Sequence, residues 1–148
     1  MVRAAAHECW PYLMFGEMLR PPEIQVPQIT ASYCKFVLDE RQHYVDPKQR
    51  HEVRDDAVQQ AVWRGPDGSL GCVFVNVSEE AVEFEVTLSD YGWDRAAYDV
   101  DRVTNGESEE WLRGVALPRG ERLELGALTV VLLRVRPHEG SKHRSDTG

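Results

Sequence analysis

The chain has 148 residues, of which 42% are hydrophobic and 28% charged, and these are the proportions of a folded domain rather than of a disordered chain. The formal net charge is −8 and no cluster of Lys or Arg occurs, which argues against nucleic acid and anionic membranes as partners. The three cysteines, Cys9, Cys34 and Cys72, are odd in number and form no C-x-x-C pair, so the sequence suggests neither a disulfide framework nor a zinc ribbon.

Residues 1–27 are expected to form short helical or irregular pieces, because Pro11 interrupts any longer helix. The stretch RPPEIQVP, residues 20–27, is expected to be extended, since prolines disfavour helix at the residues before them. No apolar run reaches the roughly 18 residues of a membrane span, and no signal-peptide pattern is present. The segment also carries a dense apolar group, consisting of Tyr12, Leu13, Met14, Phe15, Met18 and Leu19.

Residues 28–56 are predicted to hold a first strand and a charged connector. The β-branched and aromatic residues of ITASYCKFVL, residues 29–38, favour the strand. Residues 39–56 contain ten charged residues in eighteen, with a proline among them. That composition predicts a solvated loop or excursion with little core material.

Residues 57–137 show the regular alternation of a β-sandwich. After the turn signal GPDG, the stretch SLGCVFVNV is mostly apolar at both sets of alternating positions, which predicts a strand covered on both faces. In AVEFEVTL, residues 81–88, apolar residues alternate with polar ones, as in a half-buried strand. We interpret these two strands as a hairpin, with one face on the core and an acidic face, including Glu83 and Glu85, in water.

Further strands are predicted in DRAAYDVDRV, EWLRGVALP, ERLEL and ALTVVLLRVR. The last of these, residues 127–136, is apolar at both sets of positions, as a central strand would be. Seven or eight short strands, spaced about 8 to 14 residues apart, predict an all-β, antiparallel β-sandwich. The polar tail, residues 138–148, is predicted to be disordered.

No catalytic residue, metal site or cofactor is predicted for this chain. Its histidines, His7, His43, His51, His138 and His143, show no spacing typical of metal ligands. No G-x-S-x-G nucleophile elbow occurs, and the cysteines have no obvious histidine partner. The chain by itself is therefore expected not to be an enzyme.

The aromatic residues are the main candidates for a binding site. Tyr91 and Trp93 fall in a turn and Trp111 in a later strand, and exposed aromatic faces stack on the apolar C–H faces of sugars. The alternative is that these side chains fill a core or contact another domain, and Trp63 is expected to be a core residue. The glycosylation sequon Asn76-Val77-Ser78 lies in an apolar strand, so its expected role is structural.

Three passages together resemble the C-terminal end of a glycoside-hydrolase-like family: YLMFGEMLRPPEIQVP, AVWRGPDGSLGCVFVNVSEEAVEFEVTL and LELGALTVVLLRVRP. Members of that family carry a (β/α)8 catalytic barrel followed by an antiparallel β-sandwich, and the resemblance covers essentially residues 10–137. It implies that residues 1–27 are the remnant of a barrel or a linker, whose apolar side chains contact that barrel. The implied interface residues are Tyr12, Phe15, Met18 and Leu19. No catalytic residue is implied, because the catalytic carboxylates of such enzymes sit on loops at the C-terminal ends of barrel strands, and those strands lie outside the resemblance.

Three functions follow from these patterns. The first is a non-catalytic C-terminal accessory sandwich that caps or stabilises a catalytic barrel. The second is a carbohydrate-binding module that uses Tyr91, Trp93 or Trp111. The third is a stand-alone protein-interaction sandwich.

Overall fold

The computed structural model describes residues 16–34, 37–38, 40–41, 44–45, 50–93 and 95–139 of the protein. These residues form antiparallel strands and no helix, which confirms the predicted all-β fold. The strands are β1 (Glu17–Leu19), β2 (Gln28–Cys34), β3 (Val37–Leu38), β4 (Tyr44–Val45), β5 (Arg50–Asp56), β6 (Val58–Arg64), β7 (Leu70–Asn76), β8 (Val82–Leu88), β9 (Tyr98–Thr104), β10 (Glu107–Val115), β11 (Arg119–Leu125) and β12 (Val130–Pro137).

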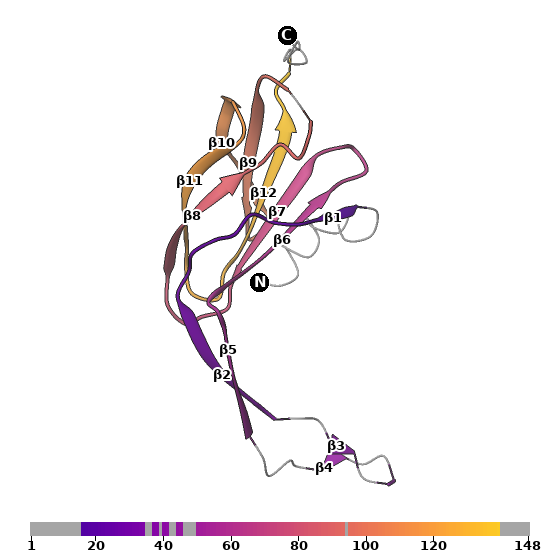
Figure 1. Ribbon diagram of the computed structural model, residues 1–148, viewed down its shortest axis with the longest axis vertical. Coiled ribbons are helices and arrows are strands. Elements are labelled where there is room, and N and C mark those ends of the chain that lie inside the picture. The colour runs from indigo at the N-terminus through magenta and orange to yellow at the C-terminus, as the bar shows by residue number, and fades with distance from the viewer. Residues whose placement is uncertain are drawn as a thin grey trace.

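A large and a small sheet enclose the core (Figure 1). The large sheet has six strands in the order β1-β6-β7-β12-β9-β10, and the small one consists of β8 and β11. Alternation decides which side chains are buried in the small sheet, as predicted for residues 81–88. In β8 the buried residues are Val82, Phe84, Val86 and Leu88, and the residues between them are exposed.

The central position of β12 agrees with its sequence. It lies between β7 and β9, and its first half carries apolar residues on both faces of the sheet, whereas Arg134 and Arg136 follow on the face opposite the main core. Val131, Leu133 and Val135 join the main core, whereas Leu132 packs with Val103 on the opposite face. The predicted central position of this strand is confirmed, but its predicted cover on both sides is not, because on the face opposite the main core Arg134 is half-buried and Arg136 exposed.

The predicted hairpin of β7 and β8 is wrong. β7 pairs with β6 and β12, whereas β8 pairs with β11, so the two strands lie in opposite sheets. Their apolar faces meet across the core, where the ring centroids of Phe74 and Phe84 lie 5.8 Å apart. The physical reason is burial, because crossing the sandwich packs the two apolar faces against each other instead of leaving them side by side on one sheet.

Residues 16–27 are built into the sandwich. β1, a strand that the sequence did not predict, pairs with β6 at the edge of the large sheet. Residues 20–27 have no regular secondary structure, as expected of this proline-rich stretch, and they contribute Ile24 and Val26 to the core. The helical or irregular pieces expected in residues 1–15 lie outside the described residues.

β2 and β5 form a two-stranded ribbon that projects from the sandwich, with the β3–β4 pair at its far end (Figure 1). We call residues 28–34 and 50–56 the arm. Most side chains of the arm are exposed, as expected of a solvated excursion. Residues 50–56 nevertheless form a strand rather than the predicted loop, because pairing with β2 satisfies their backbone groups.

Asn76 of the glycosylation sequon has the structural role expected of it. The side chain is 1% exposed, and its Nδ2 donates to the carbonyl oxygens of Glu80, Leu125 and Gly126 at 2.7, 3.3 and 2.9 Å. Its Oδ1 accepts hydrogen bonds from the amide and the hydroxyl of Ser78. Asn76 therefore ties the β7–β8 turn to the loop between β11 and β12.

The substitution Asn76→Ala is expected to lower the free energy of unfolding by about 2–4 kcal/mol, because it leaves buried carbonyl and hydroxyl groups without partners. Urea unfolding measures the change. Ser108→Ala, at an exposed position of β10, is the matched control and is expected to change stability by less than about 0.5 kcal/mol. Equal stability of the two variants would contradict the structural role of Asn76.

Candidate functional site

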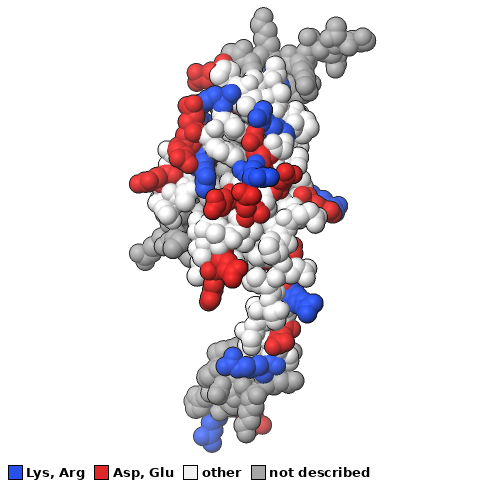
Figure 2. All heavy atoms as spheres, turned by 90° about the vertical axis from the view of Figure 1, so that its left-hand side faces the viewer, with Lys and Arg blue, Asp and Glu red and all other residues white. Residues whose placement is uncertain are grey.

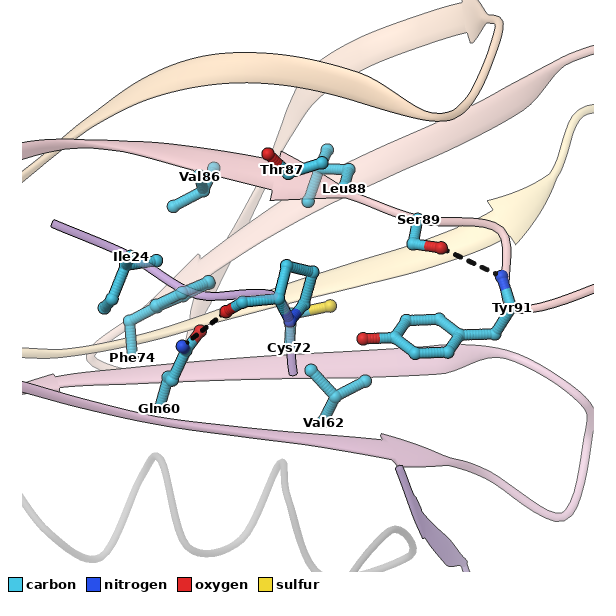
Figure 3. A pocket seen from close by; sticks show the side chains of 11 residues that line it. Ile24, Gln60, Val62, Cys72, Phe74, Val86, Thr87, Leu88, Ser89 and Tyr91 are labelled. Carbon is cyan, nitrogen blue, oxygen red and sulfur yellow. Dashed lines mark hydrogen bonds between the residues drawn. The ribbon is translucent and has the colours of Figure 1, made fainter. Parts of the chain in front are cut away.

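Tyr91 connects the turn after β8 to the entering chain. Its hydroxyl donates to the carbonyl of Arg20 at 3.0 Å, and its own carbonyl accepts a hydrogen bond from Nη2 of Arg64 at 2.9 Å. The ring points toward Cys72 in a narrow cavity between the large sheet and β8 (Figure 3). The free volume of this cavity is about 10 Å³, which is room for about one water molecule and not for a sugar ring.

The titratable groups of this cavity are held in their neutral forms. Burial raises the pKa of the Cys72 thiol to about 12, so the thiolate needed for nucleophilic attack does not form near neutral pH. Burial also raises the pKa of Tyr91, and the neighbouring Cys72 adds to that effect. The cavity is therefore part of the core and not a reactive site.

Trp93 borders an open recess of about 340 Å³ at the end of the sandwich. The recess is also lined by Asp67, Gly68, Gly92, Arg95 and Pro137. One face of the indole stacks on the buried ring of Tyr98, with centroids 6.0 Å apart and planes inclined by 12°. A ligand in the recess would therefore meet the edge or the opposite face of the indole.

The carboxylate of Asp67 contributes a hydrogen-bond acceptor beside this recess. Burial works to raise its pKa, but hydrogen bonds from the hydroxyl and the amide of Ser69 outweigh that effect and lower it. With Arg95 on the same lining, the recess combines an indole, a carboxylate and a guanidinium group. Stacking surfaces with a few polar groups are what small-molecule sites use to hold and orient a ligand.

Trp63 and Trp111, the other two tryptophans that the structure describes, lie elsewhere on the large sheet. Trp111 sits at a register shift of β10 and packs half-buried against the main core. The expectation that Trp63 is a core residue is wrong. Its strand neighbour Val62 is buried in the main core, whereas Trp63 lies half-buried on the other face of the sheet, opposite Met18 in the β1–β6 register.

The predicted interface residues are separated by the alternation of β1. Leu19 pairs with Val62 and packs against the core, whereas Met18 pairs with Trp63 and is 72% exposed. Tyr12 and Phe15 lie outside the described residues. Met18 is therefore the described part of the candidate docking surface.

A charged network that the sequence analysis did not predict covers the outer face of β9 and β12. Asp99 and Asp101 are 6% and 7% exposed. Asp99 accepts hydrogen bonds from Nη1 of Arg113 at 2.9 Å, from the amide of Gly114 at 3.0 Å and from Nδ1 of His138 at 2.8 Å. Asp101 forms an ion pair with Arg136.

The bulged backbone of β10 positions one of these donors. The β9–β10 register shifts between Leu112 and Val115, and Gly114 adopts a φ of +59°, which a residue with a side chain rarely adopts. Burial works to raise the pKa of Asp99, but the bonds from Gly114, His138 and Arg113 outweigh it and lower the pKa. Asp99 is therefore held as a carboxylate.

The network borders a cavity of about 590 Å³, also lined by Glu110, Pro137 and Glu139. A carboxylate bonded to a histidine is the arrangement that orients a general base. Here, however, both oxygens of Asp99 are already engaged by Arg113, Gly114 and His138, which come from β10 and the end of β12. The arrangement therefore resembles a hydrogen-bond network that links strands more than a catalytic pair.

A signal for this network was present in the sequence. The stretches DVD, residues 99–101, and RVR, residues 134–136, alternate charge around a buried valine. Such complementary patterns indicate two neighbouring strands with charged outer faces. His138, which the sequence places in the tail predicted to be disordered, donates its amide to the carbonyl of Ala97 at 2.9 Å, whereas residues 140–148 of that tail lie outside the described residues.

The substitution Asp99→Asn is expected to lower the free energy of unfolding at neutral pH by about 2 kcal/mol, because three donors lose their charged acceptor. The pKa of Asp99 is lower in the folded protein than its ordinary value of 3.8, so the unfolded chain takes up the proton first on acidification. The stabilisation is therefore complete above about pH 4 and is lost as the pH falls through the folded pKa.

Urea unfolding at several pH values measures this effect, and the gap between wild type and variant is expected to close in acid. Glu85→Gln, on the exposed face of β8, is the control and is expected to show no such gap. A gap that stays constant down to about pH 2 would contradict the role of the Asp99 charge.

Comparisons with known proteins add no family. No protein-family model matches the sequence, and no curated protein matches it. In the described part of the chain, no group of three or more His, Cys, Asp and Glu residues is arranged to hold a metal ion. Among the same residues, no helix is long and apolar enough to cross a membrane.

Proposed function

We propose that this chain is a non-catalytic accessory β-sandwich of a glycoside-hydrolase-like protein, and that it packs against a catalytic barrel and stabilises it. The observation that carries the proposal is the firm attachment of residues 17–27 to the sandwich. A domain that precedes this segment would be held in one orientation instead of hanging on a flexible linker.

Several contacts make this attachment firm. β1 is paired with β6, and Leu19 is packed against the core. Further along, Nε2 of Gln60 donates to the carbonyl of Pro22 at 2.6 Å, the hydroxyl of Tyr91 donates to Arg20, and the amide of Ala57 donates to Pro27 at 2.8 Å. Backbone and side-chain bonds thus hold the segment from its first described strand to the start of the arm.

The exposed surface at this junction suits contact with a further domain. Met18 is 72% exposed at the edge of the large sheet, directly where the chain enters the sandwich. Met18 lies opposite the half-buried Trp63 on the same face of the sheet, and contiguous apolar patches of this kind, when large enough, mark surfaces that another domain covers. Two side chains that could take part in chemistry are not available for it. The Cys72 thiol stays neutral, and both carboxylate oxygens of Asp99 already accept hydrogen bonds.

An antibody raised against the sandwich is expected to detect, in cells that make this protein, a polypeptide several hundred residues long. Immunoblotting of a whole-cell extract measures its size. Detection of a species of 148 residues alone would contradict the accessory role and favour a stand-alone interaction protein.

In the longer polypeptide, Tyr91→Phe combined with Gln60→Ala removes two side-chain bonds that hold residues 20–22. The thermal midpoint of the barrel is then expected to fall by about 2–4 °C, because its packing partner is less well positioned. Glu85→Gln is again the control. A barrel whose midpoint does not depend on the junction would show that the sandwich does not stabilise it.

The recess beside Trp93 favours a second candidate function, carbohydrate binding. Stacking of a sugar on the indole, with hydrogen bonds to Asp67 and Arg95, would use the groups that line this recess. Tyr91 is engaged with Arg20, and Trp111 packs against the core, so among the three candidate aromatic residues Trp93 is the one best placed to meet a ligand in an open recess.

Titration with neutral oligosaccharides is expected to change the tryptophan fluorescence if this second function holds, and Arg95→Ala is expected to weaken binding by roughly tenfold. Arg122→Ala, on the exposed face of β11, is the control. Absence of any fluorescence or calorimetric signal with a broad panel of glycans would exclude carbohydrate binding.

A further inference from the structure

The arm is an amphipathic ribbon that the sandwich leaves uncovered. In the β2–β5 register, Ala31 lies opposite Val53, and Tyr33 lies opposite His51, on one face of the ribbon. Val53 and Tyr33 are 45% and 46% exposed, and the Tyr33 and His51 rings stack with centroids 5.4 Å apart. A two-stranded ribbon in water is marginally stable on its own, whereas a wider sheet with an apolar face is stable.

The outer edge of β5 is open for pairing. Among the described strands, β5 pairs with β2 alone. The amide of Ala57 donates to Pro27, and bonded pairs alternate along an antiparallel ladder, so residues 51, 53 and 55 bond toward β2. The amide and carbonyl groups of Arg50, Glu52 and Arg54 therefore point away from the ribbon, toward a free edge.

The charges along this edge alternate in sign. Arg50, Glu52, Arg54 and Asp56 occupy successive positions on one face of β5. Figure 2 shows side chains of both signs on the projecting arm. If β5 is laid antiparallel against a second β5 with Val53 opposite Val53, Glu52 meets Arg54 and Arg50 meets Asp56, and both contacts occur twice by symmetry.

We propose that the arm is a self-association element, through which two copies of this chain pair antiparallel along β5 about a two-fold axis at Val53. In this ladder the backbone hydrogen bonds form between Glu52 of each copy and Arg54 of the other. The backbone groups of both residues point away from β2, so they are oriented for this pairing. The amide and carbonyl of Asp56 are already bonded to Asp55 and Gln59, so Asp56 meets Arg50 through its side chain.

The charges select this register over its neighbours. Centring the pair on Glu52 would place Glu52 against Glu52 and Arg50 against Arg54. Centring it on Arg54 would place Arg54 against Arg54 and Glu52 against Asp56. Both shifts put like charges opposite one another at every bonded pair, and such contacts are destabilising.

The pairing also extends the apolar face of the arm. Across the two-fold axis, Ala31, Val53, Val53 and Ala31 form one continuous row of a four-stranded sheet. His51 of one copy lies opposite Asp55 of the other. The sandwiches lie at opposite ends of this sheet, because the arm projects from each of them (Figure 1).

Light scattering coupled to size-exclusion chromatography of the 148-residue chain is expected to show a concentration-dependent dimer. Arg54→Glu and Glu52→Arg each place like charges at both central pairs, and each is expected to weaken the dimer by roughly tenfold or more. Circular dichroism checks that the sandwich stays folded. Met18→Ser, at the exposed edge of the large sheet, is the control and is expected to leave the dimer unchanged.

Mixing the two single variants provides the decisive test. One variant then carries two basic residues at the centre of β5 and the other two acidic ones, so opposite charges face each other only in the mixed dimer. A 1:1 mixture, and the double variant Glu52→Arg with Arg54→Glu, are both expected to recover dimerisation. A monomeric wild type at high concentration, a dimer insensitive to both single changes, or a mixture that stays monomeric would overturn the proposal.

Discussion

The unequal size of the two sheets is the constraint on which the rest of this structure depends. Six strands face only two, so β8 and β11 cannot cover the whole inner surface of the large sheet. Residues 20–27 fill the remaining space, with Ile24 and Val26 packed against the core and Pro22 held by Gln60. A stretch that looks like a linker is thereby a part of the core layer, since the apolar surface of β6 and β7 would otherwise face water.

This arrangement links stability to the proposed role. The segment that closes the core is also the segment through which an upstream domain would be attached. Tyr91 contributes both to closing the core and to attaching this segment. Its ring lines the cavity between the sheets, and its hydroxyl donates to the carbonyl of Arg20. Under the proposed role, a sandwich closed in this way would hold a preceding domain in a fixed orientation, with the exposed side chain of Met18 at the boundary.

The buried carboxylates of Asp99 and Asp101 connect neighbouring strands of the large sheet. Asp99 and Asp101 lie on the outer face of the sheet and are nearly inaccessible, yet each has cationic partners. Their partners come from β10 and from the end of β12, so the network fastens the last strand to its neighbours. The arm presents the opposite situation, because its charges are exposed and alternate along an open edge, where they are available to another chain.

The sequence by itself determined the fold class and the position of most strands. Alternation in AVEFEVTL and the doubly apolar ALTVVLLRVR identify a half-buried and a central strand, because side chains of a strand point to alternate faces and each face has its own environment. The buried role of Asn76 followed from the same pattern. These are local properties, and local periodicity is sufficient to reveal them.

Only the tertiary structure decided which strands pair and which faces are covered. β7 and β8 are neighbours in sequence but lie in opposite sheets, and Trp63 faces away from the main core although its strand contributes to it. β1 is a strand because the edge of β6 lies beside it, and Asp99 is a buried carboxylate because Arg113 and His138 converge on it. Such outcomes depend on contacts between residues far apart in the chain, and periodicity within one segment carries no information about the partner that the segment meets.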